Sequence, residues 1–340
     1  MKLSQAKAIA TFAIKGAMAL PKTARDAQYV VPYLISGAGL GKTSTALEIG
    51  ADLDVPVVIL SLAQYDYSEI AGWTLPNDDK TQMVRVRPDW MPTTGKGIIF
   101  LDELPQAPVT NQNIAAQLVN ERRVGPHKLP SGWVVMAAGN RTSDRAGTNT
   151  MPTHLRDRLM FLEIEADLED TIAYFSMVGV DTRIRSFLRF RPEFLHKFDR
   201  DVDSCPSPRS WQRASVIINL GMSPKASMQA LMGQIGEPAA IDFMGYLEIA
   251  KECPDPDMVI ADPDNAPIPT SSAIRYALCA SLSNRATDRN VSKIIAYLKR
   301  LTHRELAAFT IKDAWSRDPS LKKNAAVREW ALHDGSELVL

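Results

Sequence analysis

Short apolar runs alternate with longer amphipathic stretches over the first half of the chain. Turn-forming or charged residues bound each run, a pattern typical of strands that are buried on both faces of a parallel sheet. The stretches between them, such as 43–53 and 111–120, have the spacing of helices. Strands alternating with helices predict an α/β fold with a doubly wound sheet. The expected strands are 29–35, 57–60, 98–101, 134–138 and 160–164.

The pattern changes near residue 166, and the second half of the chain is typical of an all-helical region. We therefore predict an α/β core over 1–165 and an α-helical region over 166–340, and an amphipathic helix over 8–20 at the edge of the core. Prolines make 253–269 an expected stiff connection. The expected helices of the second half are 168–198, 208–221, 224–232, 237–252, 270–283, 289–300 and 303–315.

Composition is that of an ordinary globular protein, with 340 residues of which 45% are hydrophobic and 23% charged. The 39 basic and 39 acidic residues give no net charge, so bulk charge indicates neither nucleic acid nor a membrane surface as a partner. No run reaches the ~18 apolar residues of a membrane span. Cys205, Cys253 and Cys279 are widely spaced, which predicts reduced thiols in a cytoplasmic protein, with neither a disulfide framework nor a zinc site.

Residues 34–47 have the layout of a phosphate-binding loop, an apolar strand followed by a glycine-rich turn and a helix. Lys42 could reach the β- and γ-phosphates of a nucleotide, and the Thr43 hydroxyl could bind Mg²⁺. The helix beginning near Ser44 would direct the positive N-terminal end of its dipole towards the same phosphates. The usual template has glycine at position 36, where this chain has Ser36, and a chance Gly-Lys-Thr turn is the alternative. The candidate loop residues are Gly37, Ala38, Gly39, Leu40, Gly41, Lys42, Thr43 and Ser44.

Two further apolar runs end in polar residues. Asp102 and Glu103 follow the run at 98–101, and Asn140 follows the run at 134–138. Because ligands bind at the carboxyl ends of parallel strands, we expect Asp102 to face Mg²⁺ and Glu103 to polarise the attacking water. Asn140 could bond both the γ-phosphate and that water. Solvated acids and a turn asparagine are the alternatives, and the order of the three elements favours the nucleotide site.

These elements resemble those of AAA+ ATPases, most closely the MoxR-like branch and related ATPases of phages and prophages. The resemblance is carried by ISGAGLGKTS for Walker A, FLDEL for Walker B and AAGNR for sensor 1. It covers about residues 30–220, and it extends through SLAQYDYSEIAGW, LRDRL and PSPRSW. The stretch ERRVGPHKLPSGW (121–133) is similar to the inserted β-hairpin of this clade.

The resemblance implies a role for each matching residue. Asp102 would hold Mg²⁺ through water, Glu103 would be the catalytic base and Asn140 would be sensor 1. Arg158 occupies the arginine-finger position, with Arg156 as the second candidate; two exposed helix-end arginines are the alternative. Arg209 matches sensor 2 and would link a helical lid to ATP. A finger supplied by a neighbour implies a homo-oligomeric ring, which we expect to be a hexamer.

Such a ring would hydrolyse ATP with Mg²⁺ and remodel a protein or protein complex, in the cytoplasm of a bacterium or of a phage-infected cell. Its implied partner is a protein with a von Willebrand factor A domain. One alternative is a ring that binds or moves on DNA through a basic hairpin, with Arg122, Arg123, His127 and Lys128 at its tip; a solvated turn would also suit these residues. Another is an adaptor that binds ATP but barely hydrolyses it, against which Glu103 argues.

Basic and aromatic residues interleave over 183–198, a composition that can bind single-stranded nucleic acid. The spacing of Phe187, Phe190 and Phe194 instead favours a buried helix stripe with the basic residues outside. We likewise expect Trp73 and Trp90 to pack in the core or at its edge.

Overall fold

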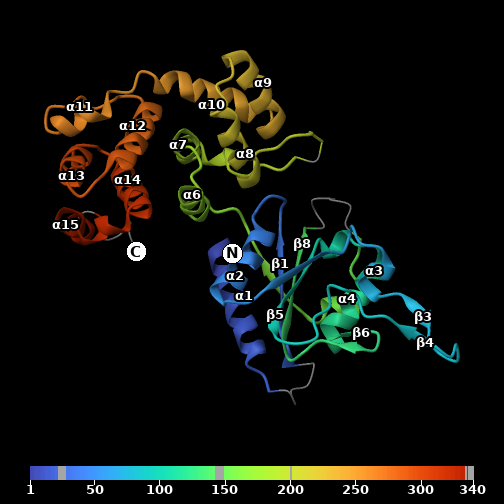
Figure 1. Ribbon diagram of the computed structural model, residues 1–340. Helices are drawn as coiled ribbons and strands as arrows, with labels where there is room; N and C mark the ends of the chain where they lie inside the picture. The colour runs from blue at the N-terminus through green and yellow to red at the C-terminus, as the bar shows by residue number, and fades with distance from the viewer. Residues whose placement is uncertain (22–27, 142–148, 200, 334, 336–340) are drawn as a thin grey trace. The chain divides into compact units, whose positions relative to one another are not determined.

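The computed structural model describes residues 1–21, 28–141, 149–199, 201–333 and 335 (Figure 1). The chain divides into two compact units, Met1–Ala166 and Asp167–Leu340. Within the described part of the chain, no helix is both long and apolar enough to cross a membrane.

The first unit is built on a parallel sheet of five strands. They are β1 (Val31–Ser36), β2 (Val57–Ser61), β5 (Lys96–Asp102), β8 (Gly132–Asn140) and β9 (Leu159–Glu163), in the order β2-β5-β8-β1-β9. Each of the five predicted apolar runs overlaps one of these strands; the first run begins two residues before β1, and the last ends one residue after β9. The register pairs Ser36 with Asn140 and Ser61 with Asp102, so polar residues meet where the strands end.

Alternating side chains of the strands enter two different cores. Leu34, Ile98 and Phe100 pack with α1 (Leu3–Met18) and α2 (Lys42–Asp52). The intervening residues, such as Tyr33, Ile99 and Leu101, pack with α3 (Tyr67–Ala71), α4 (Val109–Glu121) and α5 (Thr153–Arg156). Helices therefore cover both sides of the sheet, as Figure 1 shows for α1 and α2 on one side and α3 and α4 on the other. The predicted fold class is confirmed as an α/β core with a doubly wound parallel sheet, followed by a helical region.

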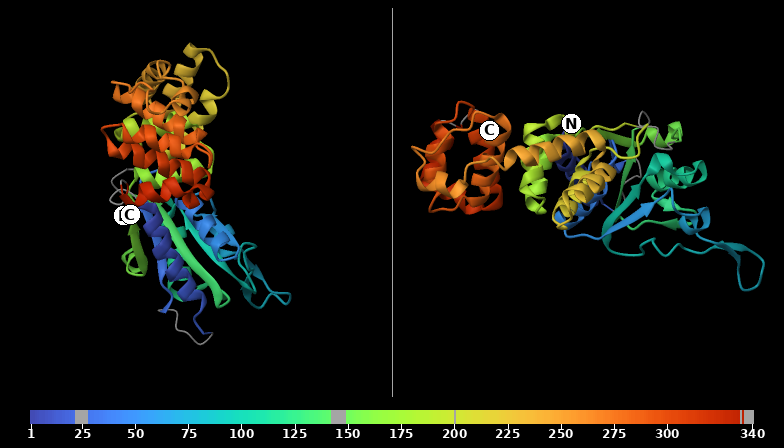
Figure 2. Two further views of the ribbon diagram at one scale, coloured as in Figure 1. Left: turned by 90° about the vertical axis from the view of Figure 1, so that its left-hand side faces the viewer. Right: turned by 90° about the horizontal axis from the view of Figure 1, so that it is seen from above.

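Two short antiparallel ribbons extend the first unit. One pairs β3 (Thr74–Pro76) with β4 (Met83–Arg85), and Figure 2 shows it reaching out from the sheet. The other pairs β6 (Arg123–Val124) with β7 (His127–Lys128). Trp73 precedes β3 and is 64% exposed, so of the two expected places, the core or its edge, the core is wrong, whereas Trp90 packs against the core. A two-stranded ribbon has no second layer to cover an outward side chain, which explains the exposure of Trp73.

The regular elements of the second unit, over its described residues, are helices joined by loops. Side chains of Asp167, Asp181 and Ser207 accept hydrogen bonds from backbone N–H groups and begin three of its helices. The helices are α6 (Leu168–Met177), α7 (Thr182–Phe190), α8 (Pro208–Ile218), α9 (Pro224–Ile235), α10 (Glu237–Ala250), α11 (Pro256–Ala261), α12 (Ser272–Arg285), α13 (Val291–Lys299), α14 (Arg304–Arg317) and α15 (Ala325–His333), with 3₁₀ turns at Pro192–Phe194 and Pro319–Lys323.

Two predictions about these helices were wrong. The expected helix 168–198 is broken into α6, α7 and a 3₁₀ turn, because Gly179 adopts a φ of +74° after α6 and ends that helix. The expected proline-rich connection 253–269 contains α11. Asp255 caps α11, and Pro256 occupies its first turn, where its missing N–H costs nothing.

The aromatic stripe is largely buried, as predicted, and Arg183 and Lys197 beside it are exposed, but Arg185 and Arg189 are not outside as expected. Phe187 and Phe194 are buried, and their rings stack at 5.9 Å between centroids. Arg189 is only 8% exposed, because its guanidinium donates to Glu169 and to Asp313, each at 2.7 Å. Arg185 is buried to the same degree and donates to the Ser176 hydroxyl and the Val180 carbonyl. These arginines hold α6, α7 and α14 together and are not available to nucleic acid.

Candidate nucleotide-binding site

The loop between β1 and α2 owes its shape to two glycines. Gly39 and Gly41 have φ of +79° and +78°, a region that residues with a side chain rarely adopt. An added Cβ at Gly41 would lie 3.5 Å from Leu3 Cδ2, which is ordinary contact, so conformation rather than space calls for glycine there. Ser36 ends strand β1 and has no positive φ, which explains why glycine is dispensable at that position.

The ammonium of Lys42 lies at the centre of the candidate site. Its Nζ donates to Asn140 Oδ1 at 2.8 Å, to Ser36 Oγ at 3.0 Å and to the Gly37 carbonyl at 3.1 Å. The strand register puts Ser36 and Asn140 side by side, so β1, β8 and the loop converge on Lys42. These three partners are neutral oxygens, and a phosphate oxygen is a stronger acceptor for an ammonium than any of them. Ser36 is a partner of Lys42 that the sequence analysis did not anticipate.

The Thr43 hydroxyl and the Asp102 carboxylate form the second pair. Thr43 Oγ1 donates to Asp102 Oδ2 at 2.6 Å, and the backbone N–H of Glu103 donates to Asp102 Oδ1 at 2.9 Å. A hydroxyl and an oriented carboxylate fit Mg²⁺, which prefers hard oxygen ligands and takes few of them from the protein when phosphates supply the rest. Over the described residues, no group of three or more His, Cys, Asp or Glu side chains could form an all-protein metal cage.

Glu103 lies in a strained turn immediately after β5. Its φ of +55° and ψ of +32° are left-handed, which costs a residue with a side chain about 1 kcal/mol or more. The turn redirects the chain from the end of β5 into the 3₁₀ turn Leu104–Gln106. Strain of this kind persists where surrounding structure enforces it, and it is frequent at catalytic sites.

Gly139 is the point where the strand of Asn140 meets the turn of Glu103. An added Cβ there would lie 2.4 Å from Pro105 Cδ and 2.4 Å from the Tyr33 hydroxyl oxygen, so only glycine allows this approach. Tyr33 is fully buried, and burial raises the pKa of its phenol above the usual range. The packing of Tyr33 against Gly139 was not predicted from the sequence, where the only sign of a close approach was the glycine directly before Asn140.

Each of the three arginines predicted to act on the nucleotide is exposed to solvent. Arg156 ends α5 and is exposed. Arg158 is about half exposed, donates to the His154 carbonyl at 3.1 Å and lies 3.5 Å from Asp157 Oδ2. Arg209 is exposed in the first turn of α8, in the second unit. Their exposure leaves all three side chains accessible from solvent.

The expected basic cluster at the hairpin tip was wrong. Arg122 is 5% exposed, and its Nη2 donates to the carbonyls of Pro130 at 3.0 Å and Trp133 at 2.7 Å. Its guanidinium also lies 3.6 Å from the centre of the Tyr29 ring. Arg123 is paired with Glu121, and His127 Nε2 is bonded to the Arg85 carbonyl. Lys128 is exposed, and the side chain of Arg123 is 41% exposed within its ion pair.

Comparisons with known proteins find only distant similarity. No protein-family model matches the chain, and no curated protein matches it. A solved structure of the RuvB Holliday junction branch migration motor of Thermotoga maritima is similar at 14% identity and a TM-score of 0.40, over 83% of this chain and 82% of that one. NtrX from Brucella abortus in complex with ATP is similar at 14% identity and a TM-score of 0.39, over 99% of this chain and 67% of that one. Because these similarities are so low, any conclusion about function has to rest on the residues of this chain.

Proposed function

We propose that this chain is a Mg²⁺-dependent ATPase of the AAA+ type. The observation that carries the proposal is the convergence of Lys42, Thr43, Asp102, Glu103 and Asn140 at the ends of β1, β5 and β8, with Lys42 bonded to Asn140 and Thr43 bonded to Asp102. One cation, a hydroxyl–carboxylate pair, a second carboxylate and an amide are the groups that phosphoryl transfer to water requires.

Each residue has a distinct part in this mechanism. Lys42 exchanges its neutral partners for the β- and γ-phosphate oxygens, and the loop N–H groups between Gly37 and Ser44 bind the same phosphates. Thr43 and Asp102 would hold Mg²⁺, and the ion when bound would neutralise the charge that develops on the phosphates. Glu103 accepts a proton from the attacking water. Asn140, released by Lys42, donates to the γ-phosphate and orients that water.

The ring is part of the same proposal, and it rests on the family resemblance. Arg158, with Arg156 as the second candidate, would enter the site of a neighbouring subunit in a hexamer, and its exposure supports this. Arg209 would link the helical region to ATP as sensor 2. The ring would act in the cytoplasm of a bacterial or phage-infected cell, remodelling a protein or protein complex together with a partner that has a von Willebrand factor A domain.

The two alternative functions have weaker support. A DNA-binding ring was motivated by the basic hairpin, and the burial of Arg122 removes the main cation of that surface. An ATP-binding adaptor without turnover would need no base, yet Glu103 is present in an enforced turn beside Asp102.

Three variants test the ATPase proposal. We expect Lys42→Ala to weaken ATP binding at least about tenfold, because it removes the only side-chain cation of the loop. Glu103→Gln should bind ATP normally and lose about 10²–10⁴ in turnover, the contribution of a general base. Lys128→Ala, an exposed cation on β7, is the matched control and should behave as the unchanged protein. Nucleotide titration and phosphate release measure the two effects.

Turnover in Glu103→Gln equal to that of the unchanged protein would contradict the catalytic assignment. At moderate salt, we expect the protein neither to bind DNA in a gel-shift measurement nor to release phosphate faster when DNA is added. Retention that falls steeply as salt rises would instead support the DNA-binding alternative.

A further inference from the structure

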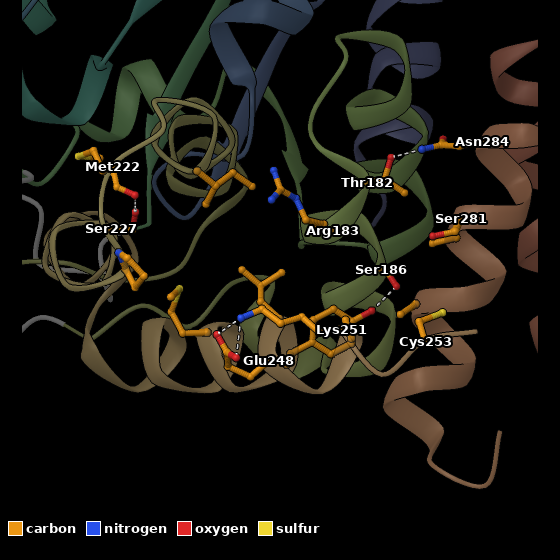
Figure 3. A pocket seen from close by; sticks show the side chains of 18 of the residues that line it. Thr182, Arg183, Ser186, Met222, Ser227, Glu248, Lys251, Cys253, Ser281 and Asn284 are labelled. Atoms are coloured by element: carbon orange, nitrogen blue, oxygen red, sulfur yellow. Dashed lines mark hydrogen bonds and ion pairs between the residues drawn. The ribbon is translucent and has the colours of Figure 1, made fainter. Parts of the chain in front are cut away.

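The helical unit contains a cavity of about 490 Å³ (Figure 3). Its lining comes from α7, from the ends of α8 and α9, from α10 and from α12. Its lining includes Ser186 and Tyr246, whose hydroxyl groups are bonded to each other at 2.5 Å. This volume lies within the range of sites that enclose small molecules, and such sites often form between packed helices.

Much of the cavity wall is apolar and adjustable. Ile218, Met222, Met244 and Leu247 contribute the larger side chains, and alanines at 250, 277 and 280 leave the space between them open. Methionine side chains adapt to differently shaped apolar groups. The wall therefore suits the apolar body of a ligand.

The charged residues of the lining are mostly cations. Arg183, Lys251 and Arg285 line the cavity, against one carboxylate, that of Glu248. Arg183 and Arg285 are paired with Asp181 and Asp257, which are outside the lining, so these pairs present their positive members to the cavity.

Lys251, the third cation of the lining, can exchange its partner with little loss of stability. Figure 3 shows Lys251 reaching to Glu248, at 2.7 Å. Both side chains are more than 60% exposed, and an ion pair this exposed contributes little to stability. Lys251 is thus free to turn towards an anionic group in the cavity.

Hydroxyl and amide groups complete the lining. Ser281 on α12 and Ser227 on α9 line the cavity from different helices, and Asn284 donates to the Thr182 hydroxyl. Such groups orient a polar head without adding charge. Cys253 also lines the cavity, and burial raises its pKa to about 11, so its thiol is protonated near neutral pH and suits non-covalent binding.

We propose that this cavity binds a small amphipathic anion, an apolar body that carries one carboxylate, sulfonate or phosphate group. The apolar wall would hold the body, and Lys251, Arg183 and Arg285 would attract the head. The anion could be a free small molecule or the last residue of a peptide with its terminal carboxylate. The proposal does not depend on ATP turnover.

Two probes that share one apolar body test the requirement for charge. The anionic probe is 8-anilinonaphthalene-1-sulfonate, and the neutral one is N-phenyl-1-naphthylamine. We expect saturable binding of one anionic probe per full-length chain, at least tenfold tighter than binding of the neutral probe. Equal affinity for the two probes, or no saturable binding, would overturn the proposal.

Variants locate the binding in the cavity. Ser281→Phe should fill the space and abolish binding of the anionic probe. The double change Lys251→Gln and Arg285→Gln should weaken the anionic probe at least fivefold and leave the neutral probe unchanged, which keeps the test valid if the filled variant does not fold. Lys293→Gln, an exposed cation on α13 outside the lining, is the matched control. Unaltered binding in Ser281→Phe, or in the double variant, would place the probe elsewhere and refute the proposal.

Competition separates the two sources of the anion. Displacement of the probe by a short peptide ending in leucine with a free carboxylate, and not by its amide, would identify a peptide end. Displacement by aryl carboxylates alone would identify a free small molecule. If no anionic competitor displaced the probe, the proposal that the cavity binds amphipathic anions would be wrong.

Discussion

Gly139 shows how much of the candidate site depends on a missing side chain. The strand of Asn140 and the turn of Glu103 approach each other at Gly139, where a Cβ would meet both Pro105 and Tyr33 at 2.4 Å. Pro105 is a rigid ring in a turn, so it cannot move aside as the end of a long side chain could. A methyl group at this position must therefore displace Asn140 or Glu103.

We predict that Gly139→Ala destabilises the first unit by about 1–3 kcal/mol, the usual effect of overpacking, and lowers turnover more than ATP affinity. Calorimetric unfolding and steady-state ATPase kinetics measure these effects. Gly16→Ala is the matched control, because its Cβ meets nothing within 4 Å and Gly16 lies in α1. That change should stabilise the helix by up to about 1 kcal/mol. Equal effects of both changes would refute the close-packing argument.

At the scale of elements, α4 and the hairpin that follows it are joined by Arg122. This residue ends α4 with a φ of +51°, and its side chain bonds the carbonyls of Pro130 and Trp133 beyond the hairpin. An arginine placed in this way holds the base of the hairpin in position, while β6 and β7 themselves have only two residues each.

We expect Arg122→Ala to lower the free energy of unfolding of the first unit by roughly 2–3 kcal/mol, because it removes two hydrogen bonds from a buried guanidinium and the contact with Tyr29, although the Trp133 N–H still donates to the Pro130 carbonyl. Arg123→Ala should change it by no more than about 0.5 kcal/mol, since its pair with Glu121 is largely exposed. Differential scanning calorimetry distinguishes the two. Equal melting temperatures of the two variants would show that Arg122 does not stabilise the first unit.

At the scale of the whole molecule, the proposed activity needs more than one copy of the chain. Glu103 would act in its own subunit, whereas Arg158 would act in a neighbour. We predict that Arg158→Ala leaves ATP affinity nearly unchanged and lowers turnover by ~10³, the scale of removing an arginine finger.

Mixing the two inactive variants gives the sharper test. Rings formed from Arg158→Ala and Glu103→Gln chains contain some interfaces with both groups intact, so phosphate release should reappear on mixing. Native mass measurement with ATP and Mg²⁺ establishes that mixed rings form. Persistent inactivity in such rings would argue against Arg158 acting between subunits, and Arg156 would then be the residue to change.

The sequence by itself determined the strands and the ends at which polar residues gather. Short apolar runs that are bounded by turns and alternate with helical stretches fit strands buried on both faces of a sheet, and parallel strands bring their carboxyl ends to one edge. The proximity of Lys42, Asp102 and Asn140 could be predicted for this reason. The prolines predicted helix boundaries less reliably than the apolar runs predicted strands. A proline disrupts the interior of a helix but is favoured in its first turn, as at Pro256.

Only the tertiary structure decided which charged residues are buried. Arg189 looks like a surface residue in its own segment, and its partner Asp313 lies 124 positions away in the sequence. Arg122 likewise looked like part of a basic patch until the carbonyls of Pro130 and Trp133 came within reach. The local pattern of apolar and polar residues shows which faces of a helix or strand are buried. Whether a charge can be buried depends on partners that only packing supplies.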